Sequence, residues 1–279
     1  MTARQMASWF LPCRLTFCPE ARVAYQLQID NMTVSLGDGE RRFILKTGAW
    51  SVTAGEVIGL TGPSGSGKTL LLELLGLLRA PDAGGYTAVP LRAGTDTPQD
   101  FSAAWRGAQA RALCAEARGK FFGFVPQAGG LLPFLSVAEN VELTQHIAKR
   151  PDAAWRDTLL GELGLSQIKH LPPGALSIGQ RQRVAIARAL AHRPFCVIAD
   201  EPTAALDPEN AQTAMRLLIE AAGAGGSATL LSSHDYATLE QFSMRRMGLE
   251  ITSAAGEPTV VSTLVPLGAQ TAQPEEAPV

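Results

Sequence analysis

One stretch constrains this chain more than any other: Gly62-Pro63-Ser64-Gly65-Ser66-Gly67-Lys68-Thr69, which matches the pattern G-x-x-x-x-G-K-[ST]. An apolar run precedes it at 57–60 and a leucine-rich run follows it at 70–75, as expected for a buried strand and a buried helix. In this motif the glycines let backbone N–H groups point inward at phosphate oxygens, and the helix N-terminus adds partial positive charge. Lys68 is expected to reach the β- and γ-phosphates, and Thr69 to ligate Mg²⁺. The alternative is a plain glycine-rich turn, but the flanking runs favour a nucleoside triphosphate site.

Composition sets broad limits on the chain. With 279 residues, of which 46% are hydrophobic, it can bury a large core in one or two domains. The formal net charge of −2 excludes a polycation that wraps nucleic acid. No stretch reaches the roughly 18 uninterrupted apolar residues of a membrane-spanning helix. Pro12 and Arg14 interrupt the apolar run near the start, so we expect no signal peptide.

The cysteines favour a reducing compartment. Four are scattered along the chain, without a Cys-x-x-Cys pair. Cys13 and Cys18 could bind a metal, but reduced thiols are the favoured interpretation. We therefore expect a cytoplasmic protein.

A second helix start carries a phosphate-binding pattern. Ser177 and Gly179, with Gln180 next to them, precede a strongly helical run over 181–190. A serine and a glycine at a helix N-terminus can bind phosphate. The arginines of this run could alternatively form an exposed basic face for an acidic partner.

Two further expected buried strands end in residues that carry chemistry. The apolar run 195–199 ends in Asp200 and Glu201, and the strand expected from residue 229 ends in His234. A carboxylate at a strand end beside a phosphate loop is suited to organise Mg²⁺, which assigns that role to Asp200. Glu201 could polarise a water against the γ-phosphate. His234 is either a structural histidine or, if its strand is parallel to that of Asp200, a third group facing the nucleotide.

The remaining pattern predicts the surrounding elements. Short strands at 25–30, 32–36 and 43–45, linked by turns, predict an antiparallel layer packed on a parallel sheet. An alanine-rich segment, 101–118, favours a helix. Ser136 with Glu139 is a capping-box signature, and we expect the helical region it opens to continue to Gly164.

Taken together, these motifs resemble the nucleotide-binding subunits of ABC transporters, over about residues 27–250. The resemblance assigns Gln127 as the glutamine switch, Leu176–Gln180 as the signature, Ala205–Asp207 as the D-loop and His234 as the switch histidine. Within the family the chain is most similar to the lipoprotein-release and macrolide-export subgroup.

The resemblance implies an α/β fold: a P-loop NTPase (RecA-like) core with a small antiparallel β layer and an inserted α-helical lobe. The expected organisation is an extension over 1–25, an ATPase domain over 26–255 and a loosely ordered tail over 256–279. Within the domain, the core comprises 26–94 and 176–255, and the lobe about 95–175.

The resemblance also implies a mechanism. ATP and Mg²⁺ are the expected cofactors, with Thr69, Gln127 and Asp200 at the metal and Glu201, Gln127 and His234 in catalysis. Two copies are expected to face each other head to tail, with each ATP between Lys68 of one copy and Ser177, Gly179 and Gln180 of the other, and with Asp207 linking the two sites. Closure then drives transmembrane subunits at the cytoplasmic face of the inner membrane, in export or lipid extraction.

Two other classes of protein remain open. One is a soluble ABC-type ATPase without a membrane partner, and the other is a nucleotide-binding regulator that does not hydrolyse.

The chain departs from the family pattern at three places. Ile178 stands where glycine is usual in the signature, and Ala204-Ala205 stands where the subgroup tends to have Gly-Asn. No aromatic residue stands at Ser35 or Leu36, where the family usually stacks one on adenine. We therefore expect poor discrimination between ATP and GTP. Phe43, which lies too far along the sequence for that position, is the one residue that could replace the missing ring.

Overall fold

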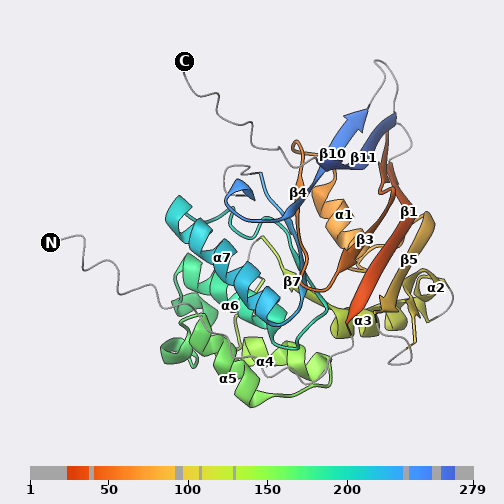
Figure 1. Cartoon of the computed structure of the whole chain (residues 1–279). Helices are drawn as coiled ribbons and strands as arrows, with labels where there is room; N and C mark the ends of the chain where they lie inside the picture. Colours follow the sequence, from red (N-terminus) through yellow and green to blue (C-terminus); the bar gives the residue numbers. More distant parts are fainter. Residues whose placement is uncertain are drawn as a thin grey trace, which may run out of the picture.

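The structure is a computed structural model, which describes residues 24–37, 41–91, 97–106, 109–127, 130–234, 239–252 and 259–267. Figure 1 shows a mixed α/β arrangement of strands and helices. The strands are β1 Tyr25–Gly37, β2 Arg42–Lys46, β3 Ala49–Thr53, β4 Val57–Thr61, β5 Ala83–Pro90, β6 Gln99–Asp100, β7 Phe122–Val125, β8 Cys196–Ala199, β9 Ala228–Ser232, β10 Arg245–Thr252 and β11 Thr259–Leu267. The helices are α1 Lys68–Leu75, α2 Phe101–Ala104, α3 Ala110–Phe121, α4 Val137–Ile147, α5 Ala153–Glu162, α6 Ile178–Leu190 and α7 Pro208–Ala224, with 3₁₀ turns at Ser166–Ile168 and Pro173–Ala175.

One sheet joins all these strands. Its order is β6-β5-β1-β2-β11-β10-β4-β9-β8-β7, with β3 paired to β1. The run β10-β4-β9-β8-β7 is parallel, and β1 pairs antiparallel with β2, β3 and β5. The predicted α/β class with an antiparallel layer beside a parallel sheet is therefore confirmed. The two parts are continuous because β11 pairs with β2 on one side and β10 on the other.

Alternate residues of the parallel strands face two separate hydrophobic cores. On β8, Cys196 and Ile198 pack in the core around α1, while Val197 and Ala199 pack in the core around α6 and α7. Side chains on a strand alternate between its faces, so a strand covered on both sides is apolar throughout. Figure 1 shows the corresponding arrangement, with α1 on one side of the parallel strands and α6 and α7 on the other.

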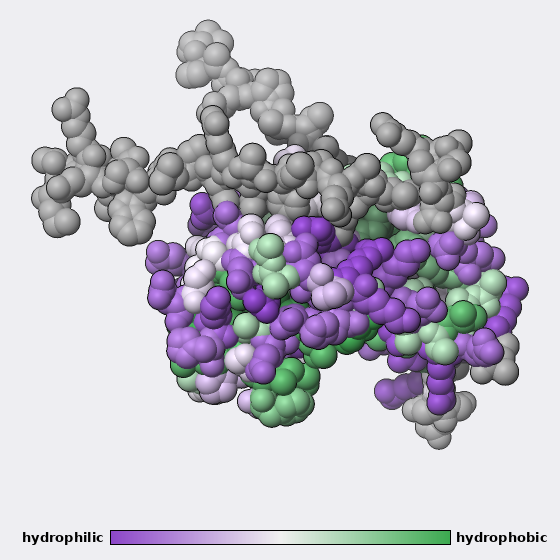
Figure 2. Space-filling view, turned by 90° about the horizontal axis from the view of Figure 1, so that it is seen from below, coloured by the Kyte–Doolittle hydropathy of each residue, from purple (hydrophilic) through white to green (hydrophobic). Residues whose placement is uncertain are grey.

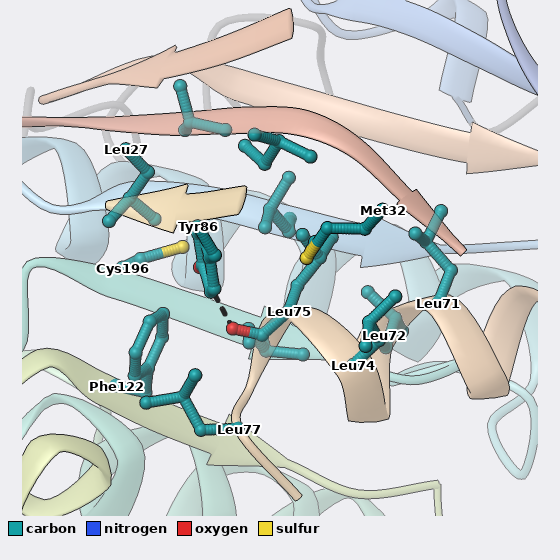
Figure 3. Close-up of a cluster of buried hydrophobic side chains, with 14 of the residues drawn as sticks. Leu27, Met32, Leu71, Leu72, Leu74, Leu75, Leu77, Tyr86, Phe122 and Cys196 are labelled. Carbon is teal, nitrogen blue, oxygen red and sulfur yellow. Dashed lines mark hydrogen bonds between the residues drawn. The ribbon is translucent and has the colours of Figure 1, made fainter. Parts of the chain in front are cut away.

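Helix α1 is buried between the antiparallel part and the parallel strands. Leucines cover most of the circumference of α1, which suits burial on several sides. Figure 3 shows Leu71, Leu72, Leu74 and Leu75 beside Met32 of β1 and Tyr86 of β5. The Tyr86 hydroxyl donates to the Leu75 carbonyl oxygen at 2.9 Å, which satisfies one of the free carbonyl groups at the helix end. This packing fixes the position of the loop that precedes α1.

Several elements differ in extent from the expectation. β1 is one strand where two were expected. The expected break corresponds to an irregularity within it, where the register to β5 shifts between Asp30 and Thr33 and Asn31 adopts a positive φ of 46°. The Ser136–Glu139 capping box is present at α4. The helical region after it is interrupted, since α4 ends at Ile147 and a second helix, α5, begins at Ala153.

The expected helical lobe over 95–175 was too broad. β7 lies within that range, yet it pairs in parallel with β8 and belongs to the main sheet. β6 pairs with β5, and α3 packs against β7. The helices that pack together as a lobe are α4 and α5, both on α6. β7, an apolar strand between helical segments, joins this region to the core.

The surface seen in Figure 2 is mostly hydrophilic. This view looks from below Figure 1, where α3, α4 and α5 lie, and hydrophobic residues gather there only in small groups. Arg156 of α5 pairs with Glu142 of α4 at 3.1 Å and with Asp157 at the same distance. Among the residues that the structure describes, no helix has the length and apolar character needed to cross a membrane.

The expectation of a loosely ordered tail from residue 256 was wrong for residues 259–267. Residues 259–267 form β11, and Leu264 is buried in the core around α1. The proline-rich composition concealed a strand in which Ser262 and Leu264, two residues apart on one face, are buried. Residues 1–23, including Cys13 and Cys18, and residues 268–279 lie outside the described residues.

If β11 contributes to the core as the structure indicates, replacing Leu264 with alanine will destabilise the protein. We expect a loss of about 2–5 kcal/mol in the free energy of unfolding, because a buried leucine leaves a cavity. The matched control is Thr263→Ala, one residue earlier and on the opposite face of the strand, which should cost much less. Denaturant unfolding followed by circular dichroism measures both. Equal, small effects would show that β11 does not pack on the core.

Candidate functional site

The phosphate-loop motif forms the connection between β4 and α1. Gly62, Gly65 and Gly67 adopt φ values of 149°, 77° and 95°, which side chains rarely allow. A Cβ at Gly62 would lie 2.8 Å from the Ser66 hydroxyl oxygen, so glycine is also required there for space. Gly67 is the N-cap of α1, and the first N–H groups of that helix are free to bind an anion.

Lys68 is the cation of this loop, and its side chain is buried. Its Nζ donates to the carbonyl oxygens of Gly62 at 2.9 Å and Pro63 at 3.2 Å, and lies 3.5 Å from His234 Nδ1. Burial lowers the pKa of Lys68, and the charges of Glu201 and Asp200 oppose that shift. A phosphate group would supply the anionic partner that a buried ammonium lacks here.

Asp200 accepts hydrogen bonds from two hydroxyl groups beside the phosphate loop. It follows β8, and its Oδ2 accepts from the Thr69 hydroxyl at 2.8 Å. Its Oδ1 accepts from the Ser232 hydroxyl at 2.7 Å, and its backbone N–H donates to the Val125 carbonyl at 3.0 Å. Hydroxyl and carboxylate oxygens are the donors that Mg²⁺ prefers, so the residues here fit that ion.

Glu201 lies at the centre of a polar network. Its carboxylate accepts from Gln127 Nε2 at 3.2 Å and is in direct contact with His234 Nε2. Its backbone has a positive φ of 45°, and its N–H donates to the Ser232 hydroxyl at 2.9 Å. A non-glycine residue in this conformation is strained unless its surroundings hold it. The structure thus brings together Lys68, Thr69, Gln127, Asp200, Glu201 and His234.

Ser232 is a site residue that the sequence reasoning missed. Its hydroxyl donates to Asp200 and accepts from the Glu201 N–H, so it fixes both acidic residues. Ser232 ends β9, the neighbour of β8 in the parallel sheet. The sequence signal available for Ser232 was a polar residue at the carboxyl end of an expected buried strand. Its partner could be recognised only once that strand was placed beside the strand that Asp200 and Glu201 follow.

The signature residues lie at the start of a different helix. Ser177 is the N-cap of α6 and forms a capping box with Gln180, at 3.2 Å and 2.9 Å. The Cβ position of Gly179 is 3.7 Å from Asn210 Oδ1 of α7, whose N-cap is Asp207. Hydrogen bonds from Asn210 lower the pKa of Asp207. These contacts stay within the first turns of α6 and α7, and Ile178 is 51% exposed there.

The alternative of a basic face on α6 does not fit the structure. Arg181 donates to the Leu176 carbonyl, Arg183 to the Leu163 carbonyl and Arg188 to the Gly130 carbonyl, at 2.6, 3.1 and 2.7 Å. These guanidinium groups hold the backbone of the surrounding segments. They are not presented together to an acidic partner.

Phe43 lies closer to the phosphate loop than its sequence position suggested. It is paired directly with Leu36 across β1 and β2. A Cβ on Gly67 would lie 3.0 Å from Cζ of its ring, so the ring edge packs against the loop. Phe43 is partly buried, while Leu36 is 38% exposed.

Comparison with known proteins agrees with this geometry. The family model for ABC transporters matches residues 45–204. The chain belongs to the ABC transporter family. A lipoprotein-releasing system ATP-binding protein, LolD 1 of Rhodospirillum rubrum, is 39% identical over 213 residues, covering 75% of this chain and 88% of the relative. The macrolide export ATP-binding/permease protein MacB of Chromobacterium violaceum is 36% identical over 77% of this chain and 32% of its own length.

A solved structure shares the fold. The ATP-binding cassette MJ0796, in a dimeric post-hydrolysis state bound to ADP and Pi, matches with a TM-score of 0.66 and 29% identity. The match covers 80% of this chain and 94% of that one. The predicted ABC-type ATPase subunit, most similar to lipoprotein-release and macrolide-export proteins, is confirmed.

Removing the Ser232 hydroxyl should slow ATP hydrolysis. In Ser232→Ala, Asp200 loses a donor and the Glu201 N–H loses its acceptor, and a hydrogen bond to a charged group contributes about 1.5–3 kcal/mol. We expect kcat to fall roughly ten- to a hundredfold, measured by phosphate release.

The control is Thr229→Val on the same strand. Thr229 is buried, and its hydroxyl has no hydrogen-bond partner within the described part of the chain. This isosteric change should leave kcat near wild type. Wild-type turnover in Ser232→Ala would show that Ser232 does not position the acidic pair.

Proposed function

We propose that this chain is the subunit that binds and hydrolyses ATP to power substrate movement through separate membrane subunits. The observation that carries the proposal is the convergence of Lys68, Thr69, Asp200 and Glu201 at the carboxyl ends of β4 and β8. Ligands of parallel sheets bind at that edge. The similarity to LolD and MacB favours export or lipoprotein extraction over import.

The proposed roles follow from the contacts. Amide groups of the loop and the Lys68 ammonium bind the β- and γ-phosphates, in place of the loop carbonyls that Lys68 now contacts. Thr69, Asp200 and the amide oxygen of Gln127 would hold Mg²⁺, which when bound neutralises charge on the phosphate oxygens. The phosphoryl group needs little covalent assistance from the protein, so positioning and charge stabilisation carry the catalysis.

Glu201 orients the attacking water and accepts its proton. Gln127 and His234 both contact this carboxylate, so they can hold it in place and release it when the γ-phosphate arrives. His234 is 49% exposed at its side chain and also lies near Lys68, which puts it at the γ-phosphate end of the loop.

The composite site needs a second copy of the chain. Ser177, Gly179 and Gln180 lie at the start of α6, whose hydrogen bonds are local, and the helix N-terminus faces outward for a phosphate of the partner. Asp207, at the start of α7 beside Gly179, is placed to link the two sites. The dimeric state of MJ0796 supports the pairing of two copies.

Location follows from the partners. The chain would attach to the cytoplasmic face of the inner membrane through its membrane subunits. The second candidate is a soluble ABC-type ATPase, which the mostly hydrophilic surface of Figure 2 permits. Affinity purification of the tagged chain from detergent-solubilised membranes separates them. A co-purifying multispanning protein that stimulates ATP hydrolysis supports transport, whereas recovery only from the soluble fraction, with unchanged ATPase activity, supports the second candidate.

Glu201→Gln should retain ATP binding and lose nearly all turnover, because an amide cannot accept the proton of the attacking water. The variant should then accumulate as an ATP-dependent dimer on size exclusion. Glu220→Gln, at an exposed position of α7, is the control for removing one negative charge. Wild-type turnover in Glu201→Gln would assign the base to another group.

Mixing two inactive variants tests the composite site. Lys68→Ala removes the loop cation and Ser177→Arg obstructs the signature, so each homodimer should be inactive. A mixed dimer contains one intact site, so activity should return to a substantial fraction of wild type. A mixture that stays as inactive as either variant alone rules out the head-to-tail arrangement.

A further inference from the structure

A hydrogen bond from β11 holds the backbone of the phosphate loop. The hydroxyl of Ser262, a fully buried residue, donates to the Ser66 carbonyl oxygen at 2.7 Å, although the two residues are 196 positions apart in the chain. The Ser66 N–H donates to the Pro63 carbonyl oxygen within the loop, at 3.2 Å. The Ser66 hydroxyl is buried and forms no hydrogen bond within the described part of the chain. Ser262 therefore holds this residue through its backbone carbonyl.

Side chains of the two strands beside β11 also lie against the loop. A Cβ at Gly67 would lie 3.0 Å from Cζ of the Phe43 ring on β2, and a Cβ at Gly62 would lie 3.3 Å from Cβ of Leu249 on β10. β11 lies between β2 and β10 in the sheet, and Figure 1 shows β10 and β11 beside α1. The loop thus rests on three strands, and Ser262 places a hydrogen-bond donor among their apolar side chains.

The bond from Ser262 fixes the orientation of the peptide between Ser66 and Gly67. The described peptide bonds include no cis bond, and the C=O and N–H of a trans peptide point in opposite directions. Because the Ser66 carbonyl points at β11, the Gly67 N–H points away from that strand. Within the described residues this N–H has no hydrogen-bond acceptor. It is therefore a donor available to a phosphate oxygen, as the motif requires.

Glycine at position 67 makes this orientation easy to lose. Gly67 adopts a φ of 95°, and glycine populates positive and negative φ about equally well. Rotation of the Ser66–Gly67 peptide would turn its N–H toward the sheet and its carbonyl oxygen toward the phosphates, which that oxygen would repel. The same rotation would leave the buried Ser262 hydroxyl without its acceptor, which is costly. Ser262 thus opposes the rotation that the glycine permits.

We propose that Ser262 is a positioning residue for nucleotide binding, which holds the Ser66–Gly67 peptide with its N–H toward the phosphates before a ligand arrives. The proposal rests on the proposed function. Ser262 bonds to the loop backbone and not to the ligand, so it acts by preorganising the loop, which reduces the cost of binding. Affinity for the triphosphate is therefore set in part from β11, a strand that follows all the catalytic residues in the chain.

The test is Ser262→Ala in the full chain. We expect calorimetric titration to show that the affinities for ATP and for inorganic tripolyphosphate, which has no base, fall by the same factor of about three- to tenfold, the effect of one lost hydrogen bond. In ATP hydrolysis, KM should rise by a similar factor while kcat stays near wild type, because bound phosphate holds the peptide in the same orientation.

The matched control is Ser227→Ala. Ser227 is also a buried serine, and its hydroxyl donates to the Pro194 carbonyl oxygen at 2.6 Å. It precedes β9 at the edge of the parallel sheet where β4 begins, away from the loop. Denaturant unfolding should show a similar loss of stability in both alanine variants. Ser227→Ala should leave the two affinities and KM unchanged.

Ser262→Cys provides the same comparison if Ser262→Ala does not fold, because a thiol is close in size to the hydroxyl and is only a weak donor. Wild-type affinities for ATP and tripolyphosphate in a folded Ser262 variant would overturn the proposal. A fall in kcat at unchanged KM would also overturn it, because that is the result of losing active protein. Failure of the wild type to bind either ligand would instead overturn the proposed function.

Discussion

The buried ammonium of Lys68 is the constraint on which the site depends. A cation removed from water needs partners, and here it contacts two loop carbonyls while two carboxylates lie close enough to oppose the fall in its pKa. Those carboxylates belong to residues that follow β8, and the loop follows β4, with β9 between them in the sheet. The parallel order of these strands is therefore what brings the charges together. Packing α1 between the two parts of the sheet then fixes the loop against them.

Glu201 shows how the sheet imposes a conformation that the residue alone disfavours. Its positive φ is held by the hydrogen bond from its N–H to Ser232, while Ser232 is held by Asp200. The carboxylate is in turn contacted by Gln127, which follows β7, and by His234, which follows β9. Such strain persists only where the surroundings over-determine it, and it points the carboxylate toward the loop. The position of the Glu201 carboxylate thus depends on β7, β8 and β9 and not on local sequence.

This dependence explains what could be predicted from sequence. Asp200, Glu201 and His234 could be placed because each follows an expected buried strand, and parallel strands end at a shared edge. Ser232 was missed because its role depends on its neighbour in the sheet, which no local pattern reveals. The pairing of Phe43 with Leu36 likewise depends on strand register. β11 was missed because prolines and acidic residues surround it, although it is rich in valine and threonine, which favour strands.

The phosphate loop is held by both parts of the sheet. The loop itself rests on glycine conformations and a buried cation, where almost any change is costly. The antiparallel part of the sheet and β11 hold the same loop from the other side, through the Phe43 ring on Gly67 and the hydrogen bond from the Ser262 hydroxyl to the Ser66 carbonyl. The loop is therefore held by strands that lie far from it in the sequence, and a change at Phe43 or Ser262 would reach the phosphate loop without altering a residue of its motif.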